Sequence, residues 1–246
     1  MNVVLMVASL SALVSAAAPS PTAAPPERPL SLELATEGSA VAVLGGTWLT
    51  LDLLGPRLAR TSCPCDRGEV NAFDRFAIDR AWPHGAPIAN AVLGATLVGA
   101  TVGSLTLAHG ARERWRNVLM LAESVTLTGA LGQGVKLGVS RPYPYMYRSS
   151  ADAFQQQSGI NYESFWSGHA AVAMAAVTTL LMEASLAHAS PALVWVLRVV
   201  GPVIALSAGV LELSSGFHFP TDVLAGGLAG ASVGVGNVLL HEAWHF

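Results

Sequence analysis

Six long apolar stretches constrain the fold of this chain more strongly than any other feature of its sequence. They lie at about residues 39–54, 88–109, 117–138, 169–187, 192–213 and 222–240. Most are 18 to 22 residues long, which is enough for a helix to cross a hydrocarbon core of about 30 Å. They lack the polar face that a helix of a soluble bundle presents to water. We therefore predict an all-α fold, a multi-pass transmembrane helical bundle of about six helices.

The composition agrees with a membrane protein. Of the 246 residues, 52% are hydrophobic and 12% are charged, and the mean hydropathy is +0.49. A soluble domain has about 25% charged residues. The net charge of −3 and the absence of a basic stripe argue against a nucleic-acid partner. The environment that the composition predicts is the lipid bilayer.

The chain before the main part of the bundle divides into three predicted segments. Residues 1–18 are apolar, end in small residues and are typical of a signal peptide, although the usual positive charge is missing; an uncleaved N-terminal anchor is the alternative. Residues 19–30 form a linker rich in proline and alanine. Residues 31–87 hold the first apolar helix and an amphipathic interfacial segment, Asp66 to Trp82. Residues 88–246 form the rest of the membrane bundle.

Glycines recur at four-residue spacing within several of the apolar stretches. They stand at positions 99 and 103, at 134 and 138, and at 226, 230 and 234. This spacing lets helix backbones approach closely in lipid. We interpret it as packing between helices of one chain rather than as a dimer interface.

Polar chemistry is concentrated where apolar segments meet loops. Asp222 follows His218 by four residues, and a carboxylate at this spacing can hold the imidazole in one tautomer and leave the other nitrogen free to attack. Ser167, Gly168 and His169 directly precede an apolar helical run. Their amides therefore lie at a helix N-terminus, where a phosphate-like anion is stabilised. Two histidines and an anion site indicate phosphoryl transfer.

The order of these groups along the chain allows them to meet in space. Lys136 lies at the end of the third apolar stretch and His169 at the start of the fourth, while His218 and Asp222 lie between the fifth and sixth. If successive helices alternate in direction, all these positions emerge on the same membrane face. The sequence therefore predicts a single site at that face.

Three sequence blocks carry this chemistry: Lys136 to Pro142, Ser164 to His169 and Gly216 to Gly226. In order and spacing they resemble the signature blocks of the type 2 phosphatidic acid phosphatase and vanadium haloperoxidase superfamily, and the resemblance covers about residues 88–240. It implies that residues 88–246 form a phosphatase-like membrane bundle. The activity it implies is that of a phosphoric monoester hydrolase acting on a lipid or isoprenoid phosphate, without a cofactor or metal.

The resemblance also implies roles for individual residues. His218 matches the nucleophile that forms a phosphohistidine, and Asp222 matches the carboxylate that orients it. His169 matches the group that protonates the leaving alkoxide and later activates water. The Ser167 hydroxyl and the Gly168 amide would hold phosphate oxygens.

The basic residues depart from the family pattern. Lys136, which would neutralise the phosphate charge, is present. The family's arginine seven residues after this lysine is replaced by Tyr143, and Arg141 is the nearest substitute. A second family arginine, six residues before the nucleophile, is replaced by Glu212. Losing one such donor costs about 2.7–4 kcal/mol of transition-state stabilisation. Both arginines that bind phosphate oxygens in the family are absent from their usual positions here.

Two other functions stay open beside the phosphatase. The first is a non-catalytic descendant that binds lipid or a partner, in which Glu212 has abolished turnover. The second is a zinc hydrolase at the C-terminus, because residues 241–245 fit the H-E-x-x-H pattern. No further ligand there has clear spacing, so we expect an interfacial helix end. A haloperoxidase is disfavoured because bound vanadate depends on the missing arginines.

The sequence allows two alternatives for the membrane orientation of the site and two for the state of the cysteines. Superfamily lipid phosphatases generally face outward, so we expect a bacterial cell membrane with the site facing the periplasm. The short arginine-rich loop at residues 112–116 is typical of the cytoplasmic side and agrees. A cleaved signal followed by six spans, and the five arginines between residues 56 and 87, favour the opposite orientation. Cys63 and Cys65 fit either a strained disulfide or an incomplete metal site.

Overall fold

The computed structural model describes residues 30–151 and 153–244 of the chain. The predicted signal peptide or anchor at residues 1–18 lies outside the described residues, as does the linker apart from Leu30. His245, the last residue of the predicted H-E-x-x-H pattern, also lies outside them.

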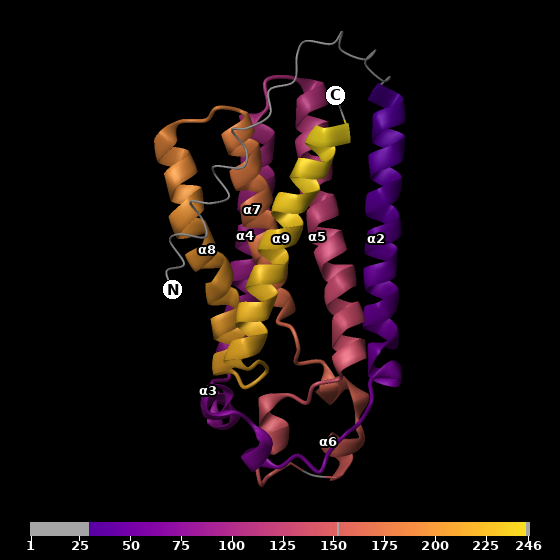
Figure 1. The fold of residues 1–246 in the computed structure, drawn as a ribbon, viewed down its shortest axis with the longest axis vertical. Coiled ribbons are helices and arrows are strands. Elements are labelled where there is room, and N and C mark those ends of the chain that lie inside the picture. The colour runs from indigo at the N-terminus through magenta and orange to yellow at the C-terminus, as the bar shows by residue number, and fades with distance from the viewer. Residues whose placement is uncertain (1–29, 152, 245–246) are drawn as a thin grey trace.

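Long helices make up most of the described chain, and they lie side by side (Figure 1). Six of them are long and apolar enough to cross a membrane. They are α2 (Leu30–Leu58), α4 (Gly85–Leu107), α5 (Ala111–Val139), α7 (Gly168–Leu186), α8 (Pro191–Ser214) and α9 (Pro220–Trp244). The described residues contain no strand. The prediction of an all-α, multi-pass helical bundle is confirmed, although α2 extends well beyond the predicted stretch at 39–54.

The ends of the helices that flank the predicted site follow local capping rules. The side chain of Ser167 caps α7 by accepting a hydrogen bond from the Ala170 amide, which satisfies one of the free N–H groups of the first turn. At the end of α5, Ser140 adopts a left-handed conformation with φ of 47° and donates its amide to the Lys136 carbonyl. The chain therefore leaves α5 three residues after Lys136 and enters α7 one residue before His169.

Helix α7 lies at the centre of the bundle and packs against α4, α5, α8 and α9. The glycines of α9 allow the closest of these contacts. A Cβ atom placed on Gly230 would lie 2.0 Å from the Ala171 carbonyl oxygen, and one on Gly226 would lie 2.4 Å from the Ser167 carbonyl oxygen. This stripe therefore packs within the chain, as predicted, whereas a Cβ atom on Gly134 or Gly138 of α5 would have no atom within 4 Å. The stripe also brings the start of α9 against the start of α7.

Apolar side chains on the outer faces of the bundle are exposed. Examples are Val43 and Leu53 of α2, Val98 of α4, Val203 of α8 and Leu228 of α9, each at least 65% exposed. Such surfaces are unfavourable in water and normal in lipid. The exposed side chains agree with the membrane spans deduced from helix length and composition.

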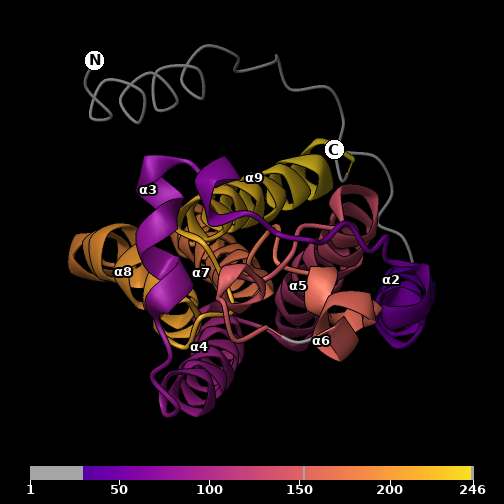
Figure 2. The ribbon, with the colours of Figure 1, turned by 90° about the horizontal axis from the view of Figure 1, so that it is seen from below.

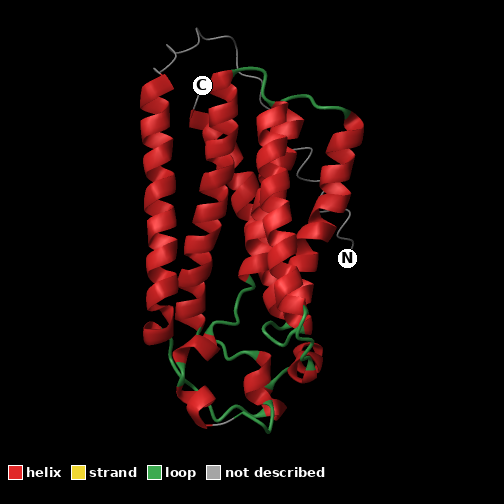
Figure 3. Ribbon diagram, turned by 180° about the vertical axis from the view of Figure 1, so that it is seen from behind, coloured by secondary structure: helices red, strands yellow, loops and turns green. Residues whose placement is uncertain are grey.

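The two ends of the bundle differ. At one end, two long connections, residues 59–84 and 140–166, form a cap of short helices, including α3 (Ala72–Arg75) and α6 (Ala153–Gln157) (Figure 2). The other end has the short connections at residues 108–110 and 187–190 (Figure 3). Cys63 and Cys65 form a disulfide within the cap. Of the two alternatives for these cysteines, the structure has the disulfide.

Hydrogen bonds join the two connections of the cap. The amide of Cys63 donates to the Tyr162 hydroxyl at 3.2 Å. The Arg148 guanidinium Nε donates to the Ile78 carbonyl at 2.6 Å. The cap is therefore one packed unit, and the interfacial segment predicted at residues 66–82 is part of it.

Candidate active site

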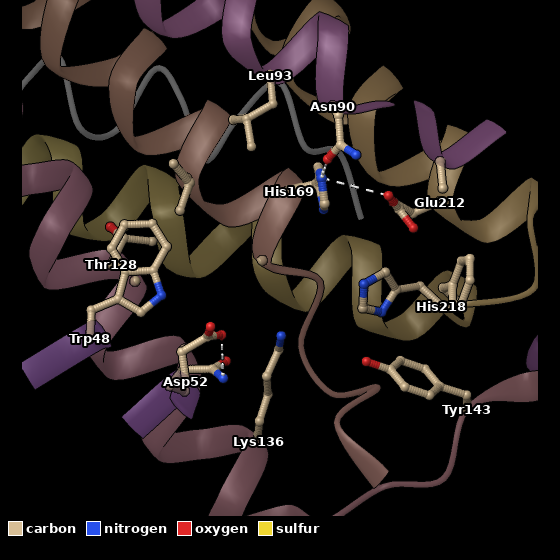
Figure 4. A pocket seen from close by; sticks show the side chains of 17 residues that line it. Trp48, Asp52, Asn90, Leu93, Thr128, Lys136, Tyr143, His169, Glu212 and His218 are labelled. Atoms are coloured by element: carbon tan, nitrogen blue, oxygen red, sulfur yellow. Dashed lines mark hydrogen bonds and ion pairs between the residues drawn. The ribbon is translucent and has the colours of Figure 1, made fainter. Parts of the chain in front are cut away.

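A cavity of about 400 Å³ opens between the helices at the cap end of the bundle (Figure 4). Most of the residues predicted to form the site line it. These are Lys136, Gly168, His169 and His218, together with the two divergent positions, Tyr143 and Glu212. The structure thus brings three separate sequence blocks to one site, as their positions along the chain predicted.

The ring of His218 is buried and held by a backbone carbonyl. Its Nδ1 lies 2.7 Å from the carbonyl oxygen of Ser164, so Nδ1 carries the proton and donates it to that oxygen. In the neutral form of the ring, Nε2 is then the nitrogen without a proton. The nearer oxygen of Asp222, Oδ2, lies 3.7 Å from Nδ1, which is too far for a hydrogen bond.

Asp222 orients His218 through the backbone around it. Its Oδ2 accepts hydrogen bonds from the Ser164 hydroxyl at 2.5 Å and from the Phe219 amide at 2.8 Å. The carboxylate therefore fixes the residue whose carbonyl holds the ring. The tautomer expected from the spacing of His218 and Asp222 is present, but a different acceptor selects it.

His169 occupies the first turn of α7 and contacts two other helices. Its Nε2 lies 2.8 Å from the side-chain oxygen of Asn90, which belongs to α4. Glu212 of α8 places its Oε1 at 3.5 Å from the same nitrogen. Glu212 therefore faces the cavity beside a histidine rather than pointing away from it.

Lys136 extends its amino group into the cavity (Figure 4). A Cβ atom on Gly168 would lie 3.9 Å from this nitrogen, so the amino group lies beside the N-terminus of α7. The positive end of the helix dipole and a cation thus share one wall, which suits a phosphate group. Two carboxylates lie on the same side of the site. The Gln133 side chain donates to both of them, to Asp52 at 3.0 Å and to Glu163 at 3.3 Å. Burial raises the pKa of the Glu163 carboxyl, and Lys136 and Gln133 offset this in part.

Arg141 does not line the cavity. Its guanidinium is held between two buried carboxylates, at 2.9 Å from Asp74 Oδ2 and 2.5 Å from Asp222 Oδ1. It also lies over the ring of Phe219, with its central carbon 4.0 Å from the ring centroid. The structure therefore places Arg141 behind the loop that carries His218, where it holds Asp74 and Asp222, and not in the phosphate-contacting position expected of a substitute arginine.

Asp74 connects the cap to the start of α9. It is fully buried and accepts hydrogen bonds from Arg141 and from the amide and hydroxyl of Thr221. Burial alone would raise the pKa of the Asp74 carboxyl, but these hydrogen bonds, with one from Asn71, lower it below its usual value. The hydrogen bonds thus stabilise the ionised carboxylate form of Asp74.

Ser167 also lies outside the cavity lining. Its side chain is fully buried and caps α7, while its amide donates to the Asp222 carbonyl at 3.0 Å. The phosphate contact expected of its hydroxyl is therefore not prepared in this structure. Gly168, the next residue, does line the cavity.

Several residues at the site were missed by the sequence interpretation. Asp52 and Asn90 line the cavity, and Asp74 and Ser164 hold its supporting hydrogen bonds. Ser164 is the first residue of the second sequence block, and this position could have marked it as a site residue. The other three lie in segments without a recognised motif, and only the packing of α2, the cap and α4 brings them in.

The C-terminal histidine pattern lies at the opposite end of the bundle. His241 Nε2 is 2.6 Å from Glu123 Oε2 and 3.7 Å from Glu37 Oε2. These three residues are close enough together to hold a metal ion. Glu242, which would be the catalytic base of a zinc hydrolase with this pattern, forms an ion pair with Arg116. Within the described residues, the pattern's own members therefore do not converge on one point.

The fold and the cavity together define an integral membrane protein whose site suits a phosphate group: two histidines, a lysine and a helix N-terminus at one end of a six-span bundle. A family model described as the PAP2 superfamily matches residues 117–245, and the chain belongs to this family. Membership supports a phosphatase-type hydrolase. Neither the curated proteins nor the solved structures gave a match. The matched region excludes Asp52, Asp74 and Asn90.

Proposed function

We propose that this protein is a membrane phosphatase that hydrolyses a lipid or isoprenoid phosphate through a phosphohistidine at His218. One observation carries the proposal. A buried histidine has its Nδ1 committed to the Ser164 carbonyl, and its ring lines a cavity shared with Lys136 and the N-terminus of α7. An imidazole held in this way presents Nε2 as a nucleophile toward a bound anion.

In the first step, the lone pair of His218 Nε2 attacks phosphorus, and the bond from phosphorus to the ester oxygen breaks. His169 gives a proton to the departing oxygen, so the alcohol leaves neutral. Lys136 and the amides at the start of α7 stabilise the charge on the phosphoryl oxygens.

In the second step, water attacks the phosphohistidine. His169, now neutral, takes a proton from the water as the new phosphorus–oxygen bond forms. The phosphorus–nitrogen bond breaks and returns the electron pair to His218. Inorganic phosphate leaves, and both histidines regain their starting protonation.

The lining of the cavity supports a substrate with an apolar tail. Beside the polar groups it includes Trp48, Leu93, Val172 and Phe217. The cavity also lies at the end of helices whose outer faces are apolar. A phosphate group on a lipid or isoprenoid chain matches this combination of a charged head and a membrane-embedded body.

Glu212 supports the second candidate function, a non-catalytic phosphatase-like protein. A carboxylate lining the cavity repels a phosphate dianion, and Arg141 is held away from it. In that case the cavity binds a lipid or a partner without turnover.

Phosphate release by detergent-purified protein separates the two candidates. A panel of lipid and isoprenoid phosphates is assayed with wild type and His218→Ala. The phosphatase proposal requires that wild type releases phosphate and that His218→Ala is inactive while remaining folded. Acid quenching with a ³²P-labelled substrate should trap an acid-labile phosphoenzyme in wild type alone. No release from any substrate would favour the non-catalytic candidate.

We also propose that the site faces the non-cytoplasmic side, the periplasm in a bacterial cell. The disulfide of Cys63 and Cys65 lies in the cap, at the same end as the cavity, and disulfides persist in oxidising compartments. The arginines of residues 112–116 lie at the other end, as expected for a cytoplasmic loop. Since α2 begins at that other end, Leu30 would then lie on the cytoplasmic side.

Fluorescent reporters that mature only in the cytoplasm test this orientation. One is inserted in the loop at residues 108–110 and one in the cap, after Arg67. The first should fluoresce and the second should not. The reverse pattern would place the site in the cytoplasm and agree with a cleaved signal peptide.

A further inference from the structure

We propose that Asn90 is a positioning residue that fixes the tautomer of His169. It would keep a proton on Nε2 throughout the reaction and make Nδ1 the atom that exchanges protons with the substrate and water. This inference rests on the proposed function of His169 as a general acid and base. Asn90 lies on α4, outside the region that matches the family.

The contact between the two side chains is short and joins separate helices. Asn90 presents its side-chain oxygen, Oδ1, at 2.8 Å from His169 Nε2. Helices α4 and α7 pack against each other, which holds the two residues in register. Both side chains line the cavity.

The chemistry of an amide oxygen determines the protonation of the ring. This oxygen accepts hydrogen bonds and cannot donate one. An unprotonated Nε2 would place two acceptors against each other at 2.8 Å, which is unfavourable in a partly desolvated site. Nε2 therefore carries a proton in the neutral ring as well as in the imidazolium.

The second ring nitrogen is then the one that changes its protonation. Figure 4 shows it directed into the space between Lys136 and His218, where the phosphate would lie. As the imidazolium, His169 donates from Nδ1 to the leaving oxygen. As the neutral Nε2–H form, it accepts a proton from water at Nδ1.

Glu212 does not replace Asn90 in this role. Its Oε1 lies 3.5 Å from Nε2, a distance at which a hydrogen bond is weak. Without the amide oxygen, the neutral ring is free to place its proton on Nδ1. In that tautomer Nδ1 has no lone pair with which to activate water. The fraction of neutral His169 that can act as a base therefore falls.

The rate of phosphohistidine hydrolysis tests the inference. The imidazolium carries a proton on Nδ1 in either case, so the tautomer matters only for the neutral ring that activates water. With a ³²P-labelled phosphatidic acid and rapid acid quenching, Asn90→Leu should slow hydrolysis of the phosphohistidine by about 30-fold and its formation much less, so that the phosphoenzyme accumulates. Asn90→Asp keeps an acceptor oxygen and should retain most of the wild-type hydrolysis rate.

Asn237→Leu is the matched control. Asn237 lies on α9 and donates to the Met120 carbonyl and to Ser124, away from the cavity. The same substitution there removes buried hydrogen bonds without touching His169. It should leave the ratio of the rates of phosphohistidine formation and hydrolysis as in wild type. If Asn90→Leu slows formation and hydrolysis equally, Asn90 has a structural role and the inference is overturned.

A second measurement does not depend on turnover. Nitrogen-15 NMR of histidine-labelled protein reports which ring nitrogen is protonated, and His169→Gln identifies the signal. The neutral ring of His169 should be the Nε2–H tautomer in wild type and in Asn90→Asp, with the Nδ1–H form rising in Asn90→Leu. An unchanged tautomer in Asn90→Leu would contradict the inference even if the protein is a phosphatase. An inactive wild type with the expected tautomers would contradict the proposed function alone.

Discussion

At the scale of single residues, the site has both histidines proposed as nucleophile and proton carrier, but its charged groups are placed differently from the family pattern. His218 and His169 both line the cavity, and Lys136 stands at the start of α7. The arginine that the first block retains, Arg141, braces the loop before α9 through Asp74 and Asp222. Lys136 and the helix N-terminus are then the main source of positive charge for a bound phosphate.

The carboxylate of Glu212 should weaken substrate binding. Glu212→Gln keeps the shape of the side chain and removes its charge, which repels a phosphate dianion in a site that is only weakly screened. We expect KM for a lipid phosphate to fall by about three- to tenfold at neutral pH. Glu212→Arg, which restores the arginine that the family pattern has at this position, should raise kcat/KM. Initial rates across substrate concentrations measure both, and a loss of kcat in Glu212→Gln would show that the carboxylate has a positive role.

Asp74 should stabilise the protein in a pH-dependent way. Asp74→Asn removes the charge that Arg141 and Thr221 bind, and hydrogen bonds to a charged group contribute about 1.5–3 kcal/mol. Because the pKa of Asp74 is lowered in the folded state, its stabilisation is present above the pKa of the unfolded chain and is lost as pH falls through the folded value. Wild type should therefore unfold at a higher temperature than Asp74→Asn at pH 6 to 7. The difference should shrink below about pH 4.

Thermal unfolding in detergent, followed by circular dichroism across this pH range, measures the difference. Asp79→Asn is a suitable control, since Asp79 pairs with Arg67 on the exposed surface of the cap. Exposed ion pairs contribute little. A constant difference between wild type and Asp74→Asn down to pH 3 would contradict the assignment.

At the scale of secondary-structure elements, the contact between α7 and α9 sets the separation of the two histidines. His169 is the second residue of α7, and His218 lies two residues before the first residue of α9. The glycines of α9 let the two backbones touch. The geometry of the site is therefore determined partly by residues that have no chemical role.

Gly230→Ala should separate these helices. The added Cβ would lie 2.0 Å from the Ala171 carbonyl oxygen, and overpacking of this kind costs about 1–3 kcal/mol. We expect a lower unfolding temperature and a loss of phosphate release. Gly236→Ala lies on the same helix with no atom within 4 Å of the new Cβ, so it should leave both nearly unchanged. Equal effects of the two substitutions would rule out the proposed contact.

The sequence predicted these elements better than it predicted their polar contacts. Helix length and apolar composition are local properties, so the spans and the meeting of Lys136, His169 and His218 followed from them. The partners of these residues depend on packing between distant segments. Asn90 reaches His169 and Asp74 reaches Arg141 across 79 and 67 residues of sequence. No local pattern marks either pair, and the family's blocks do not contain Asn90 or Asp74.

At the scale of the whole molecule, ionisable residues gather at both ends of the bundle. The cap end holds the cavity, and the other end holds His241 with Glu123 and Glu37. The two sets lie at opposite ends of the bundle, because α9 begins beside the cavity and carries His241 near its other end. They should behave independently.

His241→Gln should therefore lower stability without altering the kinetics of the folded protein. The substitution removes the imidazole that pairs with Glu123, and breaking a partly buried pair is destabilising. We expect unchanged kcat and KM for folded protein, and no effect of a chelator, because the proposed phosphoryl transfer uses side chains and helix amides. Loss of activity in His241→Gln that zinc restores would instead favour a metal-dependent reaction at that end.

The one-sided cap has a consequence for the substrate supply. The cavity opens at one end of the bundle, and in the described part of the chain the connections at the opposite end are short. A phosphatase built in this way would remove phosphate from lipids of a single leaflet. Its action would make the two leaflets chemically different, and lipids of the other leaflet would become substrates only after crossing the bilayer. The rate of that crossing would then limit how much of the membrane's lipid phosphate the enzyme consumes.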